Sequence, residues 1–299
     1  MTAVIVPADT TRAPAPAKPR PSGPVGREGL LVFVARHAIA IAIVVCALAP
    51  VLFIVLTSFM SPQQSLSSDY WPTTWHFGNY LDVFRKLDMG RYLLNTLLYA
   101  ILATGFMLIS SVPAAYALSK LKWRGRNFVF LVVICMMLLP PQITTVPLYL
   151  WWANFHLTGT LWPLILPNLL GDAFSIFLLR QFMVTIPDEY LDAARVDGAG
   201  EWRTLLRVII PMARPGIAAT SMFMFFYCWN DYYGPYLYTS ENRSNWTLSF
   251  ALASFHGLHN VEWNLVMAAA VITVVPILVL FFFAQKAFVQ GITLTGVKG

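Results

Sequence analysis

A short run of aromatic and polar residues is the first feature of this sequence that could bind a solute. The run consists of Tyr227, Trp229, Asn230, Asp231, Tyr232 and Tyr233. Aromatic faces stack against sugar rings, and amide and carboxylate groups hydrogen-bond hydroxyls, so these residues are candidates for solute or gate contacts. The alternative is an interfacial belt, because Trp and Tyr also gather where a membrane meets water. The sequence leaves both interpretations open.

A single acidic residue, Asp172, is the second candidate because it interrupts a long apolar stretch after Arg126. A charge in the middle of a membrane helix costs about 2.5–3.5 kcal/mol by insertion scales unless it faces water or a partner. The preceding Gly171 is expected to loosen the helix there. We predict that Asp172 lies on a solute path or contacts a packing partner. A protonated, hydrogen-bonded structural role is the alternative.

Patterns for catalysis and metal binding are missing from the sequence. It contains no G-x-x-x-x-G-K-[ST] phosphate loop, no H-E-x-x-H and no G-x-S-x-G motif. Cys46, Cys135 and Cys228 each lie in an apolar stretch without a C-x-x-C pair, which indicates small buried side chains. We therefore expect no catalytic residue, no metal site and no cofactor. Whatever the chain moves needs an ion gradient or a partner that supplies energy.

The composition is that of a polytopic membrane protein. Hydrophobic residues make up 58% of the 299 residues and charged residues only 11%, against roughly 25% charged in an ordinary soluble domain. A soluble globule with so few charges would leave apolar surface exposed and aggregate. This excludes a soluble enzyme, a disordered protein and a disulfide scaffold.

Long intervals without Asp, Glu, Lys or Arg predict six spans, because a membrane helix needs about 20 apolar residues. The spans are expected near residues 38–59, 93–118, 128–148, 161–182, 215–236 and 264–284. The Pro140–Pro141 pair should break the third span, which is tolerated where the freed carbonyls are buried or line a cavity. The predicted fold class is an all-α membrane protein with six transmembrane helices and a cytoplasmic helix-turn-helix loop.

The Lys and Arg residues predict the orientation. With both termini in the cytoplasm, 16 of the 20 basic residues lie inside and four lie outside, which satisfies the positive-inside rule. The four outer residues are Arg85, Lys86, Arg91 and Arg243. The net charge of +6 is thus explained by topology, and nucleic-acid binding is not expected. We expect a multi-pass protein of the plasma (inner) membrane.

The first 28 residues contain six prolines and predict a disordered cytoplasmic tail. Residues 29–299 are then the membrane domain. A cleaved signal peptide ending at Ala47–Ala49 is the alternative, but the preceding basic region is long and the apolar run continues past Pro50 to Phe59. An uncleaved first span is therefore favoured.

The inner loop of residues 184–215 predicts two short helices joined by a glycine turn. Thr185 is expected to cap the first, which should end at the Asp197–Gly200 turn, and the second should run from Glu201 to Ile210 and stop at Pro211. Trp202, Leu205, Leu206 and Ile209 share one helical face. Such a loop either lies on the membrane surface or fills a groove on a cytoplasmic partner.

The spacing in this loop resembles a known motif. Asp192-Ala193-Ala194, then Gly198, then Val208-x-Ile210-Pro211 resembles the EAA loop, E-A-A-x3-G-x9-I-x-L-P, of the membrane subunits of bacterial ATP-binding cassette (ABC) importers. Asp192 stands for the usual Glu, and Val208 and Ile210 stand for Ile and Leu. Further segments resemble the carbohydrate-importer branch, which includes the maltose permease, over roughly residues 38–299: Pro113–Leu118, Pro147–Tyr149, Phe177–Phe182, Trp229–Asp231 and Gly291–Gly299.

The resemblance implies a non-catalytic permease subunit whose loop docks in a cleft of a cytoplasmic ATPase. The implied coupling residues are Asp192, Ala193, Ala194, Asp197, Gly198, Ala199, Trp202, Leu205 and Pro211. The C-terminal tail, from Thr293 to Lys298, is implied to contact the same ATPase. The implied partners are a second permease, an ATPase dimer, an extracytoplasmic solute-binding protein and the lipid bilayer. Relatives for mono-, di- and oligosaccharides and for glycerol phosphate share these motifs, so the solute is not named.

Two other classes of function remain as alternatives. An ion-coupled secondary transporter is disfavoured by six spans, by the missing inverted repeat and by the scarcity of intramembrane acids. A membrane-embedded enzyme is disfavoured because no paired catalytic residues occur in the spans. The histidines lie at or outside the span ends: His37, His76, His156, His256 and His259.

The orientation can be tested with a fusion at the C-terminus. A fluorescent reporter that matures only in the cytoplasm, attached at Lys298, should give a signal, because an even number of spans returns the chain to its starting side. A dark fusion, with an active periplasmic reporter at the same position, would contradict the six-span count.

Overall fold

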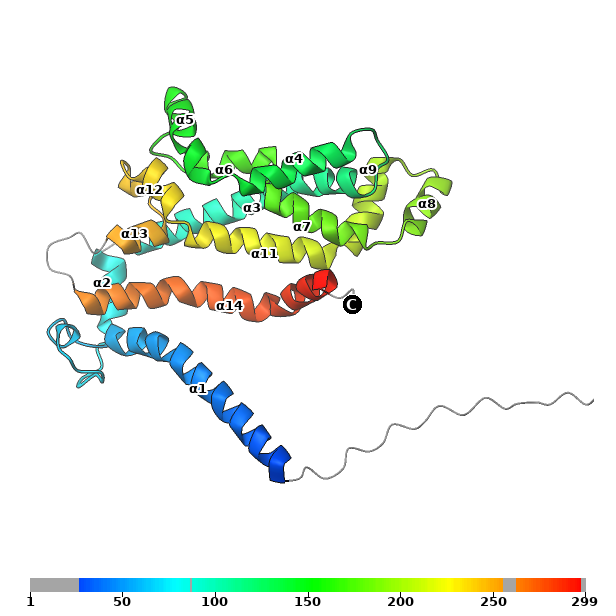
Figure 1. The fold of residues 1–299 in the computed structure, drawn as a ribbon. Coiled ribbons are helices and arrows are strands. Elements are labelled where there is room, and N and C mark those ends of the chain that lie inside the picture. The colour runs from blue at the N-terminus through cyan, green and yellow to red at the C-terminus, as the bar shows by residue number, and fades with distance from the viewer. Residues whose placement is uncertain (1–26, 87, 255–261, 297–299) are drawn as a thin grey trace, which may run out of the picture. The chain divides into compact units, whose positions relative to one another are not determined.

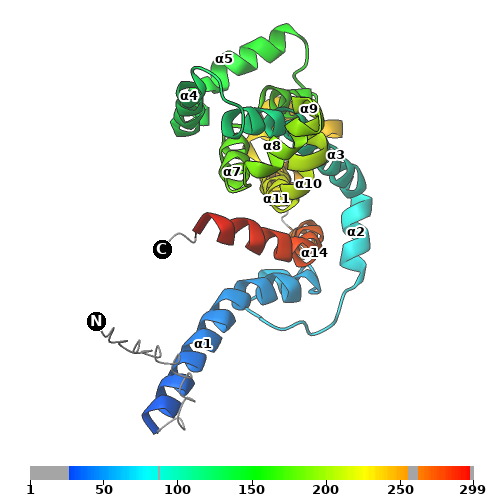
Figure 2. The same ribbon diagram turned by 90° about the vertical axis from the view of Figure 1, so that its right-hand side faces the viewer.

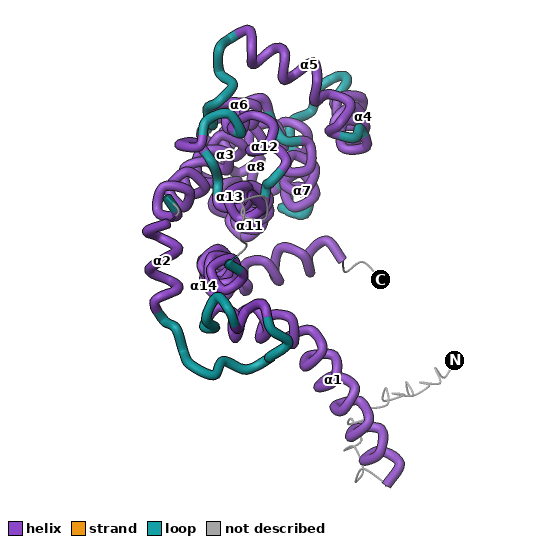
Figure 3. Tube along the Cα trace, turned by 90° about the vertical axis from the view of Figure 1, so that its left-hand side faces the viewer, coloured by secondary structure: helices purple, strands orange, loops and turns teal. Residues whose placement is uncertain are grey.

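The computed structural model describes residues 27–86, 88–254 and 262–296, all of it helix and connecting loop without a strand (Figure 3). The chain divides into two units, one up to Val51 and one from Leu52 onward. Helix α1 (Arg27–Ser58) begins in the first unit and continues through Pro50. Residues 1–26 of the predicted tail lie outside the described residues, and Arg27 and Glu28 already belong to α1.

Four helices that pack against one another form the centre of the second unit (Figure 1). They are α3 (Met89–Ser119), α7 (Ala173–Val184), α11 (Arg214–Asn230) and α14 (Trp263–Gly296). Helix α3 packs against both α7 and α11, and α14 packs against α11. Ala100, Ala103 and Ala115 of α3 are fully buried, and such small side chains let helix backbones approach closely in a membrane protein. Helix α3 is therefore the central helix of this unit.

Shorter helices close the two ends of the unit. At one end lie α2 (Gly78–Lys86), α12 (Tyr233–Thr239) and α13 (Leu248–Ser254), and at the other end α8 (Glu189–Val196) and α9 (Glu201–Thr204), as Figure 1 shows. Figure 2 views the unit from the α8 end. The remaining elements are η1 (Gln64–Leu66), α4 (Arg126–Leu138), α5 (Pro141–Asn154), α6 (Trp162–Ile165), η2 (Leu166–Leu170), η3 (Leu205–Ile209), α10 (Ile210–Met212) and η4 (Arg243–Asn245).

The candidate membrane spans among the described residues number four, or up to six if each bent helix pair forms one span. The four single segments are Val32–Ser58, Met89–Ser119, Trp162–Val184 and Trp263–Phe283. The bent pairs are α4 with α5, at 92°, and Glu201–Met212 with α11, at 80°. The first bend confirms the break predicted at Pro140–Pro141, where Pro140 is extended and α5 begins at Pro141.

The fifth predicted span, 215–236, is too long at its outer end. Helix α11 stops at Asn230, Asp231 has an extended backbone, and α12 starts only at Tyr233. The side chain of Asp231 accepts a hydrogen bond from the backbone N–H of Gly234 at 3.0 Å, which stabilises this turn. The aromatic run is therefore divided between two helices and a turn.

The fourth span is interrupted at Gly171, as expected. Gly171 has φ of +97°, which only glycine adopts readily, and Asp172 is the N-cap of α7. Asp172 thus lies near the middle of the candidate span Trp162–Val184, directly after the expected break. The hydroxyl of Ser110 in α3 donates to the Asn168 carbonyl at 2.8 Å, and the Asp172 N–H donates to Ser111 Oγ at 3.2 Å. Helix α3 therefore satisfies the backbone groups that the break exposes.

Candidate functional site

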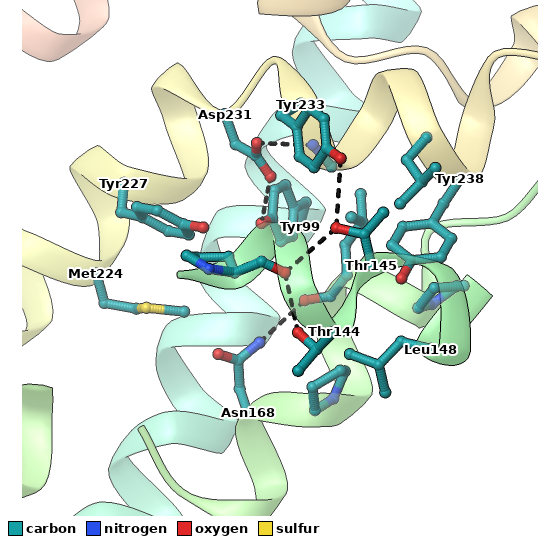
Figure 4. Close-up of a pocket in the computed structure, with 16 residues that line it drawn as sticks. Tyr99, Thr144, Thr145, Leu148, Asn168, Met224, Tyr227, Asp231, Tyr233 and Tyr238 are labelled. Carbon is teal, nitrogen blue, oxygen red and sulfur yellow. Dashed lines mark hydrogen bonds between the residues drawn. The ribbon is translucent and has the colours of Figure 1, made fainter. Parts of the chain in front are cut away.

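A cavity of about 270 Å³ lies beside α5, α6 and α12, and Figure 4 shows its lining. Its wall combines aromatic and polar side chains with apolar ones. The polar side chains are Tyr99, Thr144, Thr145, Asn168, Tyr227, Asp231, Tyr233 and Tyr238. Hydroxyl, amide and carboxylate groups next to aromatic rings suit a polyhydroxylated solute.

Asp231 is held in place on the wall of this cavity. Its Oδ2 accepts a hydrogen bond from the Tyr99 hydroxyl at 3.0 Å, and its Oδ1 accepts the Gly234 N–H. Gly234 is packed so closely that a Cβ there would lie 2.5 Å from Asp231 Oδ2 and 2.8 Å from Leu164. The carboxylate therefore ties the end of α11 to α3 and to the start of α12.

A second cavity, of about 500 Å³, adjoins the first. It is lined by Asn168, Asp172, Phe174, Ser175, Phe223, Met224 and Tyr227. Asn168, Met224 and Tyr227 line both cavities, so the two share a wall. Asp172 Oδ2 accepts the Ser175 N–H at 2.7 Å and caps α7, which holds its carboxylate at the cavity margin.

The predicted solute contacts separate into two groups in space. Tyr227, Asp231 and Asp172 line the cavities, and the Tyr227 side chain is 65% exposed. Trp229 is 1% exposed, and its Nε1–H donates to the Thr273 carbonyl of α14 at 3.1 Å, so it packs in the core of this chain. Asn230 is exposed but lines neither cavity, and its amide donates to the Phe226 carbonyl.

Sequence reasoning missed five of the polar residues that line the first cavity: Tyr99, Thr144, Thr145, Asn168 and Tyr238. Tyr99 lies 132 positions before its partner Asp231, so no local pattern links them. Asn168 is an amide in an apolar stretch, four positions before Asp172, and its polarity was a usable signal.

At the opposite end, the glycine turn of the loop has the predicted geometry. Gly198 has φ of +75°, its N–H donates to the Arg195 carbonyl at 3.0 Å, and the Ala199 N–H donates to Ala194 at 2.9 Å. These bonds close the end of α8. The turn therefore depends on a residue that tolerates a left-handed backbone.

One face of the loop packs into the bundle. Leu191, Ala194, Leu205 and Ile209 are buried, and Leu191, Leu205 and Ile209 form one cluster with side chains of α3 and α7. The α3 and α7 members include Val112, Ala115, Tyr116, Leu179, Phe182 and Met183. Of the predicted coupling residues, Ala194 and Leu205 thus stabilise the loop from inside.

The opposite face of the loop is exposed. It carries the coupling candidates Asp192, Ala193, Asp197, Gly198, Trp202 and Pro211, while Ala199 is half-buried. The predicted apolar face is wrong for Leu206, which is exposed; Trp202 is 68% exposed but lines a cavity together with Leu205. Residues 205–209 form a π-helical turn, whose wider spacing breaks the 3.6-residue period.

Two predicted boundaries of the loop are also wrong. The second helix continues through Pro211 to Met212. A proline ring disrupts the hydrogen bonds of a regular α-helix, but here a π-helical turn precedes Pro211 and changes the backbone spacing. Thr185 does not cap α8, because its hydroxyl donates to the Phe182 carbonyl at the end of α7 at 2.7 Å.

Helix α8 begins at Glu189, and the preceding Asp188 forms a salt bridge with Lys120 at 2.7 Å. The hydrogen bond from Lys120 lowers the pKa of Asp188. The charge of Asp188 therefore faces α3 and is not used as an N-cap.

The tail residues are only partly described. Thr293 belongs to α14, and Lys298 lies outside the described residues. Within the described part of the chain, no three His, Cys, Asp or Glu side chains lie together where they could hold a metal ion.

Known proteins are similar to this chain in sequence. Residues 107–294 match the family described as "Binding-protein-dependent transport system inner membrane component". The diacetylchitobiose uptake system permease protein NgcG of Streptomyces coelicolor is 30% identical over 261 residues, which cover 86% of each chain. The arabinooligosaccharides transport system permease protein AraQ of Halalkalibacterium halodurans is 29% identical over 258 residues, covering 85% of this chain and 92% of that protein.

The fold also matches a solved structure. A bacterial ABC transporter involved in the import of the acidic polysaccharide alginate contains a chain with a TM-score of 0.79 at 23% identity, covering 88% of this chain and 98% of that one. The chain belongs to the family of binding-protein-dependent transport system inner membrane components, and it is an ABC importer permease.

Substitutions at Asp172 separate its charge from its role as a helix cap. Asparagine caps a helix about as well as aspartate, so Asp172→Asn removes the charge and keeps the cap. If the carboxylate contacts the solute path, uptake by the assembled importer should fall about tenfold, the effect of one lost charge-assisted hydrogen bond, with unchanged melting temperature.

The matched variant Asp172→Ala removes the cap as well, which costs about 0.5–2 kcal/mol and should lower the melting temperature. Uptake and thermal unfolding of the purified complex are the two measurements. Wild-type uptake in Asp172→Asn together with a destabilised Asp172→Ala would make Asp172 a purely structural cap.

Proposed function

We propose that this chain is one of two permease subunits that form the path for a sugar or sugar-like solute. The adjoining cavities carry this proposal, because their walls together offer hydroxyl, amide and carboxylate groups beside aromatic rings. The names of the relatives support the solute class, since they describe uptake of diacetylchitobiose and of arabinooligosaccharides. Tyr227 and Asp231 are the proposed solute or gate contacts, with Asp172 at the cavity margin.

We further propose that the exposed face of the loop docks on a cytoplasmic ATPase. The exposed residues Asp192, Asp197 and Trp202 lie around the Gly198 turn. Because the inner face of the loop packs against the bundle, the exposed face is held in a fixed position. The proposed assembly contains a second permease, an ATPase dimer that hydrolyses ATP, and an extracytoplasmic binding protein that delivers the solute. With six spans and cytoplasmic termini, the loop lies on the ATPase side in this proposal.

The tail is included in the proposed interface. Helix α14 runs to Gly296 and contains Thr293, whereas Lys298 lies outside the described residues. In the proposed assembly this tail contacts the ATPase beside the loop.

An uptake experiment tests the solute and the energy source together. Proteoliposomes with this chain, its companion permease and the ATPase would receive binding protein and one labelled solute: diacetylchitobiose, arabinotriose, maltose or glycerol 3-phosphate. Uptake of a saccharide should require both ATP and binding protein. Ion-driven uptake by this chain alone would contradict the importer assembly, and ATP-driven uptake restricted to glycerol 3-phosphate would contradict the sugar assignment.

A valine at Gly198 tests the docking loop. The positive φ of Gly198 makes even alanine unfavourable by about 1 kcal/mol, and a β-branched side chain is worse. No atom lies within 4 Å of a Cβ built there, so the effect comes from the backbone and from the docking partner. Gly198→Val should leave the chain in the membrane while uptake, stimulated ATP hydrolysis and co-purification of the ATPase all fall.

Gly200→Val is the matched control, two positions away. Gly200 has φ of −72° and ψ of 164°, which a β-branched residue adopts readily, and its Cβ also meets no atom within 4 Å. Gly200→Val should retain more uptake and ATPase binding than Gly198→Val. Normal uptake and normal co-purification in Gly198→Val would show that the loop does not dock on the ATPase.

A further inference from the structure

Lys120, directly after the last turn of α3, is a buried lysine with two acceptors in the loop. Its side chain is only 4% exposed. The ammonium donates to the backbone carbonyl of Ile186 and forms the 2.7 Å salt bridge with Asp188. Both acceptors belong to the segment that leads into α8. A buried charge needs such partners, so this contact holds the start of α8 against α3.

Tyr116, one helical turn earlier on α3, holds the other helix of the loop. Its hydroxyl donates to Glu201 Oε2 at 2.5 Å, and Glu201 is the first residue of α9. Glu201 also pairs with Arg195 at 3.3 Å, and Arg195 pairs with Asp192 at 3.3 Å. The last turn of α3 and the residue after it therefore hold both helices of the loop.

The same helix holds the walls of the two cavities. Tyr99 donates to Asp231, Ser110 donates to the Asn168 carbonyl, and Ser111 accepts the Asp172 N–H. Helix α3 stays continuous through Pro113, so its cavity contacts and its loop contacts belong to one helix. From Tyr99 to Lys120 a helix rises about 32 Å.

The chain segments on either side of the loop connect it less firmly to α7 and α11. On one side Thr185–Asp188 separates α7 from α8, and on the other side an 80° bend separates α10 from α11. A bend or a connecting segment absorbs movement, whereas two side-chain contacts to one continuous helix transmit it.

We propose that Lys120 and Tyr116 are positioning residues that transmit movement of the loop through α3 to the cavities. The proposal rests on the proposed docking of the loop on the ATPase. Neither residue contacts the ATPase or the solute, and both act by keeping the loop and α3 in one arrangement during the transport cycle.

The test compares uptake with ATP hydrolysis in the reconstituted importer. The probe is the saccharide of the panel above that the wild-type importer takes up fastest. In Lys120→Met and in Tyr116→Phe the solute moved per ATP hydrolysed should fall about tenfold, the effect of one lost charged hydrogen bond. ATPase co-purification and the maximal rate of ATP hydrolysis should stay near wild type.

Lys122→Met is the matched control. Lys122 lies two positions after Lys120, is exposed and forms no ion pair among the described residues. Its ratio of uptake to ATP hydrolysis should equal that of the wild type. The combined effect of Tyr116→Phe and Glu201→Gln should be smaller than the sum of their separate effects, because both weaken the Tyr116–Glu201 bond, while Glu201→Gln also removes the ion pair with Arg195.

Two outcomes would overturn the proposal. One is a wild-type ratio of solute uptake to ATP hydrolysis in assembled complexes that carry Lys120→Met or Tyr116→Phe. The other is an equal loss of uptake and ATP hydrolysis in Tyr116→Phe, which keeps the ring and removes only the hydroxyl; that loss would show a structural role. If Gly198→Val lowers ATPase binding while the Lys120 and Tyr116 variants keep the wild-type ratio of uptake to ATP hydrolysis, only the proposal for α3 fails. If Gly198→Val also behaves normally, the docking assignment fails as well.

Discussion

The structure depends on one constraint: in hydrocarbon, every interruption of a helix must find another partner for its freed backbone groups. The fourth span is interrupted at Gly171, and Ser110 and Ser111 of α3 supply the missing partners there. At this satisfied break, Asn168 in the short helix η2 and Asp172 at the start of α7 line the cavities. The polar wall therefore exists because α3 lies directly behind it.

Helix geometry also explains why the aromatic run serves two purposes. Tyr227 and Trp229 are two positions apart, which turns their side chains roughly 200° from each other on α11. Trp229 accordingly packs against α14 in the core, while Tyr227 lines both cavities. Asp231 follows after the helix has ended, where Tyr99 and Gly234 hold its carboxylate.

The loop at the other end shows the same division into an inner and an outer face. Its inner side chains join the cluster of α3 and α7, and its outer face presents acidic residues and Trp202 around the Gly198 turn. The contacts of Lys120 and Tyr116 add directional bonds to this apolar packing. These contacts together fix the position of the loop on the bundle.

The sequence alone determined the features that depend on local chemistry. Hydropathy located the apolar segments, the Pro140–Pro141 pair and Gly171 marked the breaks, and the motif spacing located the glycine turn at Gly198. Tertiary structure decided which side chains meet, because those contacts join distant positions. Tyr99 reaches Asp231 across 132 residues, and Lys120 reaches Asp188 across 68. It also decided that Leu206 is exposed while Leu205 and Ile209 are buried, because residues 205–209 form a π-helical turn, which helical periodicity does not predict.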